Sequence, residues 1–221
     1  MENSESPGTR TLRRRNPRGE GSRLGGEIVD AALEIVRRTG SSESVTLRSV
    51  AREVGIAAPS IYAHFPDREA ILAAAVVKVF DDLRYRIQQA VEPESDPIDR
   101  LVAGTQAYVS FGLENPGPYS LLFARANLGP GFDTPPEFPF HELPPIGGEG
   151  FGLLVDSIRD CVDAGVSSST DVFADATAVW VALHGTISLW SSMCAGPWPG
   201  GRDFIRQLTL TLARIESPCG S

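Results

Sequence analysis

Apolar residues recur every three to four positions along most of this chain, which is the spacing that an amphipathic helix requires. From Leu24 the pattern predicts a first helix that ends at Gly40, with arginines in its last turn, where the helix dipole favours cations. Its inward stripe consists of Ile28, Ala31, Ala32, Ile35 and Val36. The stripe indicates a helix with one face packed on a core.

Two short helices joined by a tight turn are expected next. Thr46 is a good N-cap for the first of them, which ends at Gly55. The second covers residues 58–64, where Pro59 is tolerated because its missing N–H falls in the first turn. A long helix capped by Asp67 follows. Two short helices joined by a glycine-containing turn and braced on either side are a helix-turn-helix.

The remainder of the chain is also helical in pattern. Six prolines and five glycines over residues 126–150 interrupt it and predict a long loop, either a lid or entrance loop or a disordered segment. The expected helices cover residues 98–114, 119–126, 148–164, 169–194 and 203–216. The fold class is therefore all-α, with about nine helices in the whole chain.

The charge is distributed unevenly along the chain. The 221 residues carry a formal net charge of −8, which as a bulk figure argues against a protein that coats nucleic acid. Residues 1–68 sum to +2, however, and residues 69–221 sum to −10. Six arginines face only Glu20 in the N-terminal arm: Arg10, Arg13, Arg14, Arg15, Arg18 and Arg23. Nucleic-acid contact is thus expected at the N-terminal end, and the acidic remainder argues against a nucleoid-type architectural protein.

Other classes of protein find little support. No run approaches the roughly 18 apolar residues of a membrane span, and no secretory signal is expected. Cys161, Cys194 and Cys219 form no Cys-x-x-Cys pair, so neither a zinc site nor a disulfide framework is expected, and the reducing cytoplasm is the predicted location.

Catalytic motifs are not found either. The three histidines are scattered, and the glycine-rich residues 147–152 follow a proline-rich stretch and contain no lysine, unlike a phosphate-binding loop. No catalytic residue, metal or cofactor is expected. A small helical ligand-binding protein or enzyme without a DNA role remains the alternative.

The short helix over residues 58–64 carries outward side chains that are small or able to form hydrogen bonds. Small residues allow a helix to approach base edges and the thymine methyl group, and hydroxyl and imidazole groups can reach phosphates. The stretch from Thr46 to Leu72, TLRSVAREVGIAAPSIYAHFPDREAIL, resembles the DNA-binding motif of the tetracycline-repressor (TetR) family. The resemblance covers residues 28–72 nearly continuously.

This resemblance implies roles for individual residues. Thr46 and Arg48 would lie against the DNA backbone, Tyr62 and His64 would contact phosphates, and Arg68 keeps the charge of the lysine usual in the family. The residues implied at the base-reading end of the recognition helix are Ala57, Ala58, Pro59 and Ser60, of which Pro59 replaces the common glycine. The alternatives are that Tyr62 is partly a core residue and that Arg48 is solvated surface.

A second resemblance lies in the C-terminal part. Trp180-Val-Ala-Leu-His184-Gly185, with Tyr119-Ser-Leu-Leu-Phe123 upstream, resembles the ligand-binding domain variety named for its Trp-His-Gly signature. It implies a small-molecule cavity with His184 as polar handle. The aromatic candidates for its wall are Tyr108, Phe111, Phe123, Trp180 and Trp190. Plain core packing is the alternative for each of them, and for His184 a buried, hydrogen-bonded role.

Small residues along the penultimate helix, with the apolar face of the last helix, suit a four-helix dimer interface. Two recognition helices about 34–36 Å apart would read a palindrome in double-stranded DNA. The expected organisation is a disordered basic arm (1–22), a helix-turn-helix domain (23–69) and a ligand-binding and dimerisation domain (70–221). The sequence thus predicts a cytoplasmic, homodimeric repressor without a membrane segment, released from its operator by a small apolar or aromatic effector.

Overall fold

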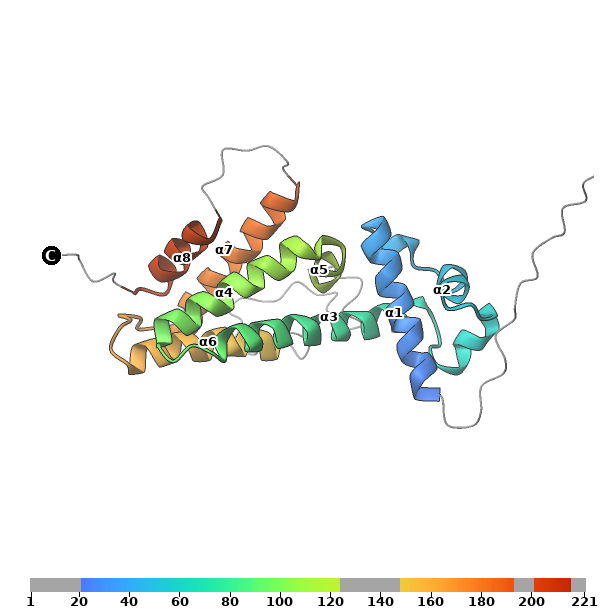
Figure 1. Ribbon diagram of the computed structural model, residues 1–221, viewed down its shortest axis with the longest axis horizontal. Coiled ribbons are helices and arrows are strands. Elements are labelled where there is room, and N and C mark those ends of the chain that lie inside the picture. Colours follow the sequence, from blue (N-terminus) through green and yellow to red (C-terminus); the bar gives the residue numbers. More distant parts are fainter. Residues whose placement is uncertain (1–20, 124–147, 193–200, 216–221) are drawn as a thin grey trace, which may run out of the picture. The chain divides into compact units, whose positions relative to one another are not determined.

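The computed structural model describes residues 21–123, 148–192 and 201–215 (Figure 1). Helices are the only regular elements in these ranges, where one isolated bridge joins Ser167 to Ile215. The all-α prediction is therefore confirmed. The elements are α1 (Gly21–Thr39), η1 (Ser42–Ser44), α2 (Leu47–Val54), η2 (Ala58–Ala63), α3 (Arg68–Val91), α4 (Pro97–Glu114), α5 (Pro116–Phe123), α6 (Gly148–Asp163), α7 (Val172–Ser192) and α8 (Gly201–Leu212).

The chain divides into two compact units, one up to Ala75 and one from Val76 onward, here called the N-terminal and C-terminal units. α3 begins in the first and ends in the second, so a continuous helix joins them (Figure 1). The domain boundary expected after residue 69 falls within this helix. Nearly all of the basic arm and of the proline-rich loop lies outside the described residues.

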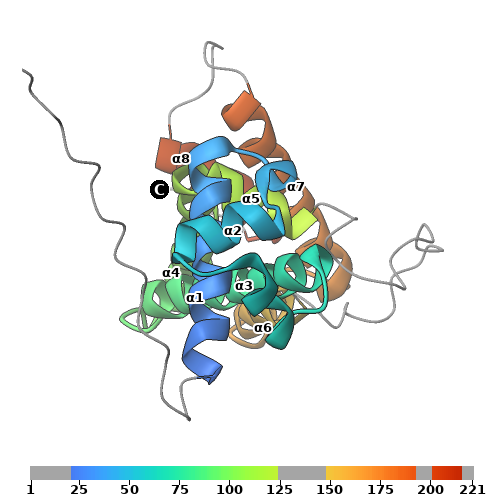
Figure 2. The ribbon, with the colours of Figure 1, turned by 90° about the vertical axis from the view of Figure 1, so that its right-hand side faces the viewer.

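In the N-terminal unit, α1 packs against η1 and α2, and α2 packs against η2 (Figure 2). Apolar side chains from α1, α2 and η2, from Val45 directly after η1, and from the first turns of α3 are fully buried. They include Ile28, Leu33, Val36, Val45, Val50, Ile61 and Ile71. The inward stripe predicted for the first helix is confirmed, because all five of its residues are buried.

The recognition element η2 differs from the expected α-helix, since it is a 3₁₀ helix. Its backbone bonds include Ser60 N–H to the Ala57 carbonyl and His64 N–H to the Ile61 carbonyl, each spanning three residues. Pro59 has no N–H to donate, and Pro66 prevents continuation beyond the segment. A segment this short therefore closes in the tighter 3₁₀ form.

In the C-terminal unit, α4 packs against α5, α6, α7 and α8. Figure 1 shows α4 in green among its neighbours. α4 and α7 approach closely at Gly112, where a Cβ atom would lie 2.8 Å from the Ile187 side chain. Only glycine fits there without displacing Ile187.

α7 is the one helix, within the described ranges, that is long and apolar enough to cross a membrane by length and composition, with a window of mean hydropathy 1.4. Core helices of soluble bundles pass the same test. Here Val179, Leu183 and Ile187 are buried, and α7 packs against α4, α6 and α8. These contacts are those of a bundle helix.

Several helix ends differ from the sequence-based expectation, among them the start of α5 and the end of α8. α5 begins at Pro116 rather than at Tyr119, because proline is well suited to the first position of a helix. α8 ends at Leu212, several residues early, and Arg214 takes a positive φ of 53°. The chain then pairs with the segment between α6 and α7, where the Arg214 carbonyl accepts from Ser168 N–H at 3.0 Å.

Candidate DNA-binding surface and effector site

The outer face of η2 carries the side chains predicted to meet DNA. Tyr62 is 60% exposed, and Ala57, Pro59 and Ser60 are also exposed, whereas Ala58 is half-buried. Ile61, at 0% exposure, anchors the same turn in the core. The structure thus brings these predicted residues together on one small surface supported by a buried side chain.

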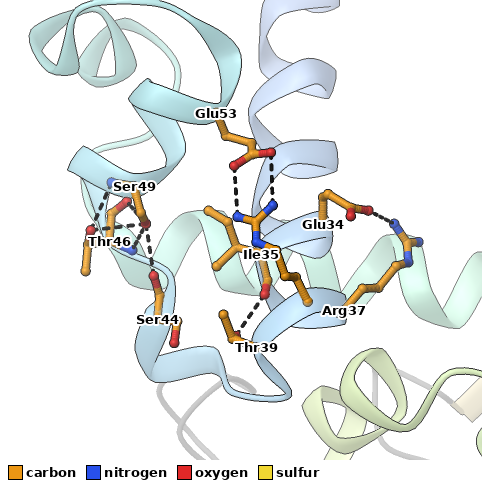
Figure 3. A network of polar contacts seen from close by, with 9 residues as sticks. Glu34, Ile35, Arg37, Thr39, Ser44, Thr46, Ser49 and Glu53 are labelled. Carbon is orange, nitrogen blue, oxygen red and sulfur yellow. Dashed lines mark hydrogen bonds and ion pairs between the residues drawn. The ribbon is translucent and has the colours of Figure 1, made fainter.

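Thr46 and Arg48 lie at the start of α2. Thr46 is the N-cap: its hydroxyl accepts from Ser49 N–H at 3.0 Å, and Ser49 Oγ accepts from Thr46 N–H at 2.8 Å (Figure 3). This reciprocal capping box satisfies two backbone donors and fixes where α2 begins. Thr46 and Arg48 are both exposed, so this helix start is open to a partner.

His64 follows η2 directly and is half-buried. Its ring lies beside α1, because a Cβ added at Gly25 would be 3.9 Å from Nδ1. His64 is therefore partly packed against α1 and partly exposed.

Arg68 has its guanidinium turned toward the backbone of its own unit. Nε donates to the Val45 carbonyl at 2.7 Å and Nη2 donates to the Ser42 carbonyl at 2.7 Å. Nη1 lies 3.3 Å from the Glu69 carboxylate. Of the predicted DNA-binding residues, Arg68 is the one whose charged group already has several protein partners.

A cleft with a mostly acidic lining lies in the N-terminal unit. Arg38 bonds Glu53 with two N–H···O contacts of 3.3 and 3.0 Å, and this hydrogen bonding lowers the pKa of the Glu53 carboxyl (Figure 3). The cleft, of about 430 Å³, lies between α1 and α2. Its lining is Glu27, Asp30, Ala31, Glu34, Arg37, Glu53 and Val54, none of which belongs to the predicted surfaces.

An aromatic cluster with a polar centre lies in the C-terminal unit. The hydroxyls of Tyr108 and Tyr119 are 2.8 Å apart, and the Tyr119 hydroxyl is 2.8 Å from His184 Nδ1. The His184 ring lies 4.2 Å from that of Phe123 and is stacked 6.1 Å from that of Trp180, centroid to centroid. Three helices, α4, α5 and α7, thus meet through one hydrogen-bonded chain of rings.

Burial controls the protonation of this cluster. It raises the pKa of Tyr108 to about 12, raises that of Tyr119 as well, and lowers that of His184. All three groups are therefore neutral near pH 7, because burial disfavours the charged form. The cluster thus holds hydrogen-bonding atoms without net charge among aromatic rings.

The cluster contains four of the six predicted effector residues. Phe111 is buried with its ring 5.8 Å from the Arg86 guanidinium, and Trp190 packs near Phe204 of α8 with centroids 6.2 Å apart. The members missed by the sequence-based prediction are Tyr119, Phe151 and Phe173. Tyr119 stood within the quoted Trp-His-Gly resemblance, but its bond to His184 spans 65 residues and no local pattern signals it.

One face of α7 exposes apolar and small side chains. Val181 is 56% exposed and Leu189 is 48% exposed. Ala174, Ala178 and Ser188 on this face are also exposed.

Within the described ranges, no group of three or more histidine, cysteine, aspartate and glutamate side chains is arranged to hold a metal ion.

Curated relatives match part of the chain. The nucleoid occlusion factor SlmA of Photobacterium profundum is 28% identical over 100 residues, which are 45% of this chain and 51% of that protein. SlmA of Vibrio cholerae serotype O1 is 25% identical over the same length and the same shares. The chain thus aligns over about half the length of the curated relatives it matches.

Solved structures align with a larger share of this chain than the curated relatives do. A protein of unknown function from Rhodococcus sp. RHA1 has a TM-score of 0.69 at 24% identity, over 86% of this chain and 94% of that one. The TetR family transcriptional regulator PfmR of Thermus thermophilus has a TM-score of 0.62 at 21% identity, over 86% and 98%. These likenesses establish a shared fold.

Two family models match the chain directly. Residues 28–75 match the bacterial regulatory proteins of the tetR family, and residues 101–205 match the tetracyclin repressor-like C-terminal domain. Together the matches span more than half of the chain, and they include the helix-turn-helix and the aromatic cluster. The chain therefore belongs to the TetR family of DNA-binding transcriptional regulators.

Proposed function

We propose that this regulator is a homodimeric repressor that reads a palindromic operator with η2 and is released by a small apolar or aromatic effector. The observation that carries the proposal is the exposed face of η2, with Tyr62 outward and Ile61 locked in the core. A rigidly anchored turn with small and hydroxyl-bearing side chains can enter a major groove without clashing.

The proposed contacts fall into two groups. Tyr62, His64 and Thr46 bind phosphates and set the register, with Arg48 adding charge at the start of α2. Residues 57–60 approach the base edges. Because these four residues carry only one polar side chain, Ser60, direct readout on this surface depends on apolar contact and close fit.

Binding to the DNA immediately upstream of the gene tests the proposal most directly, by gel shift and by fluorescence anisotropy across a salt series. Tyr62→Phe removes the proposed phosphate donor and is expected to weaken binding to all sequences by a similar factor. Tyr85→Phe is the matched control, since Tyr85 is 63% exposed on α3 in the other unit. Equal affinities for the two variants would contradict the assignment of Tyr62.

The exposed face of α7 is the proposed dimer contact, with the apolar face of α8. An exposed apolar stripe on a long helix is typical of a surface that a second helix covers. Val181→Glu and Leu189→Glu are expected to convert dimer to monomer in sedimentation experiments and to weaken operator binding. Val77→Glu, at a site 47% exposed on α3, is the control and should leave the dimer intact.

The aromatic cluster is the proposed effector site. An effector that binds better to the DNA-free conformation shifts the population toward it, and each tenfold loss of DNA affinity corresponds to about 1.4 kcal/mol of differential binding. The gel shift repeated with candidate small molecules tests this. His184→Phe or Tyr119→Phe should abolish the response to an active compound while DNA binding in its absence persists.

A second candidate function rests on the curated relatives, which are named as nucleoid occlusion factors. A protein acting across the nucleoid would occupy many chromosomal sites, whereas a local repressor would occupy few. Mapping occupancy by chromatin immunoprecipitation separates the two, and the excess of acidic residues in the C-terminal unit favours the local repressor.

A further inference from the structure

The segment between α1 and α2 presents three backbone carbonyls to side chains from outside it. Ser42 and Val45 carbonyls accept from Arg68, each at 2.7 Å, and the Ser44 carbonyl accepts from Ser49 Oγ at 2.9 Å. Arg68 lies 26 residues beyond Ser42 in the chain. These bonds therefore tie the first residue of α3 to the segment that leads into α2.

The chemistry of this contact requires arginine. A guanidinium holds its N–H donors in a rigid planar fork, so one group can reach two carbonyls with a fixed geometry. An ammonium group is a single point at the end of a flexible stem and does not reproduce that geometry. The Arg68 side chain is 31% exposed and Val45 is 0% exposed, so the contact is partly shielded from water.

The segment that Arg68 holds ends one residue before Thr46, which is a proposed DNA contact. Val45 precedes Thr46, whose hydroxyl and N–H make the capping box with Ser49. Holding the Ser42 and Val45 carbonyls thus sets the position from which Thr46 caps α2 and faces outward. At its other end, α3 continues as far as Val91 in the C-terminal unit.

We propose that Arg68 is a positioning residue for DNA binding: its guanidinium clamps the Ser42 and Val45 carbonyls and so places the capped start of α2 against the phosphate backbone. The clamp also links the first turn of α3 to that helix start. This inference rests on the proposed contact of Thr46 with DNA, and it replaces the phosphate contact expected of Arg68 from the family resemblance.

The surroundings of the guanidinium favour the clamp over a phosphate contact. Nε has a single hydrogen, and the Val45 carbonyl takes it. On the open side, the Glu69 carboxylate lies 3.3 Å from Nη1 and is 65% exposed. A phosphate approaching from there meets a like charge, which weakens its attraction to Arg68.

Two substitutions at the same position separate the roles. Arg68→Lys keeps the positive charge but lacks the planar set of N–H donors. Arg68→Met keeps a side chain of similar length but has neither the charge nor the donors. A phosphate ligand contributes to the slope of log K against log salt by about 0.9 per contact, whereas a positioning residue does not. The controls are Arg48→Met, at a proposed phosphate contact, and Arg37→Met, which removes only an exposed ion pair with Glu34.

The readouts are the affinity for the upstream duplex, its salt slope, and amide hydrogen exchange of Ser49 and Val50 by NMR. Both Arg68 variants are expected to bind about tenfold more weakly with an unchanged slope, a loss that corresponds to about 1.4 kcal/mol. The Ser49 and Val50 amides should exchange faster, because the cap is less well held. Arg48→Met should lower the slope, and Arg37→Met should change neither quantity.

Two outcomes overturn the proposal. In the first, Arg68→Lys binds as the wild type does and Arg68→Met loses about 0.9 in slope, which makes Arg68 a phosphate ligand. In the second, neither variant changes the exchange at Ser49. A wild-type protein that binds neither the upstream duplex nor a mixed-sequence duplex at low salt would refute the proposed function instead, and the exchange data would still decide whether Arg68 holds the cap.

Discussion

The two units of this chain use polar side chains in opposite ways. In the N-terminal unit, the Thr46–Ser49 capping box joins residues three apart and is exposed. In the C-terminal unit, Tyr119 and His184 meet across 65 residues inside a cluster of rings. The first arrangement leaves hydrogen-bonding groups at the surface for a partner, and the second removes them from water. The proposed DNA-binding surface has the former arrangement, and the proposed effector site has the latter.

The largest expected effect is at Gly112 of the C-terminal unit, and Gly26 of the N-terminal unit is its control. Gly112→Ala forces its Cβ to within 2.8 Å of Ile187, so we expect the C-terminal unit to lose about 1–3 kcal/mol of unfolding free energy. Gly26→Ala, at an exposed position of α1 where an added Cβ would meet nothing within 4 Å, should instead add about 0.5–1 kcal/mol. Urea unfolding followed by circular dichroism measures both, and changes of the same sign would contradict the close packing of α4 on α7.

Breaking an ion pair should also cost more stability in the C-terminal unit than in the N-terminal unit. Arg214 Nε lies 2.9 Å from Asp175, whose side chain is only 9% exposed. Arg214→Met leaves that carboxylate without its cation, at a cost of about 1–2 kcal/mol once the 59% exposure of Arg214 is allowed for. Arg38→Met, which breaks the exposed pair with Glu53, is the control and should leave thermal stability nearly unchanged.

The capping box should stabilise α2 and the unit around it, with little effect on the C-terminal unit. Thr46→Ala removes the side-chain acceptor for Ser49 N–H and is expected to destabilise the N-terminal unit by about 1 kcal/mol. Hydrogen exchange should then accelerate in α2 and remain unchanged in α4 and α7. Thr211→Ala, an exposed position of α8, is the control; a comparable loss there would mean that the effect is not due to the cap.

The smallest expected effect is the pH dependence of the aromatic cluster. Burial lowers the pKa of His184 from 6.5, so below that pH the unfolded chain binds a proton that the folded chain does not. Stability should therefore fall as the pH decreases from about 6.5 toward the lowered pKa, and the loss should level off below it. His184→Gln should flatten this part of a melting-temperature profile, and an unaltered profile would argue against a buried neutral imidazole.

Much of the N-terminal unit could be predicted from the sequence because its determinants are local. Thr46 as N-cap, Gly55 as the end of α2 and Asp67 ahead of α3 are each confirmed, and Asp67 Oδ1 accepts from Ala70 N–H at 2.8 Å. Each depends on residues within one helical turn. The 3₁₀ form of η2 was not predicted, since the spacing of apolar residues does not separate it from a short α-helix.

The C-terminal unit was harder to predict because its key contacts join distant residues. Of the six residues predicted for the effector site, Tyr108, Phe123, Trp180 and His184 meet in one cluster, whereas Phe111 and Trp190 lie outside it. Periodicity alone could not separate them from Phe111, since an inward aromatic ring on a helix looks the same whether it faces an effector site or a plain core.

By itself the sequence determined the helices, the helix-turn-helix and the contrast between a basic N-terminal end and an acidic remainder. These properties follow from side-chain spacing, capping and charge along the chain. Only the tertiary structure decided which rings meet around His184 and that the Arg68 guanidinium binds two carbonyls of its own unit. The physical reason is that a hydrogen bond between distant residues depends on how the helices pack, and local spacing does not encode that packing.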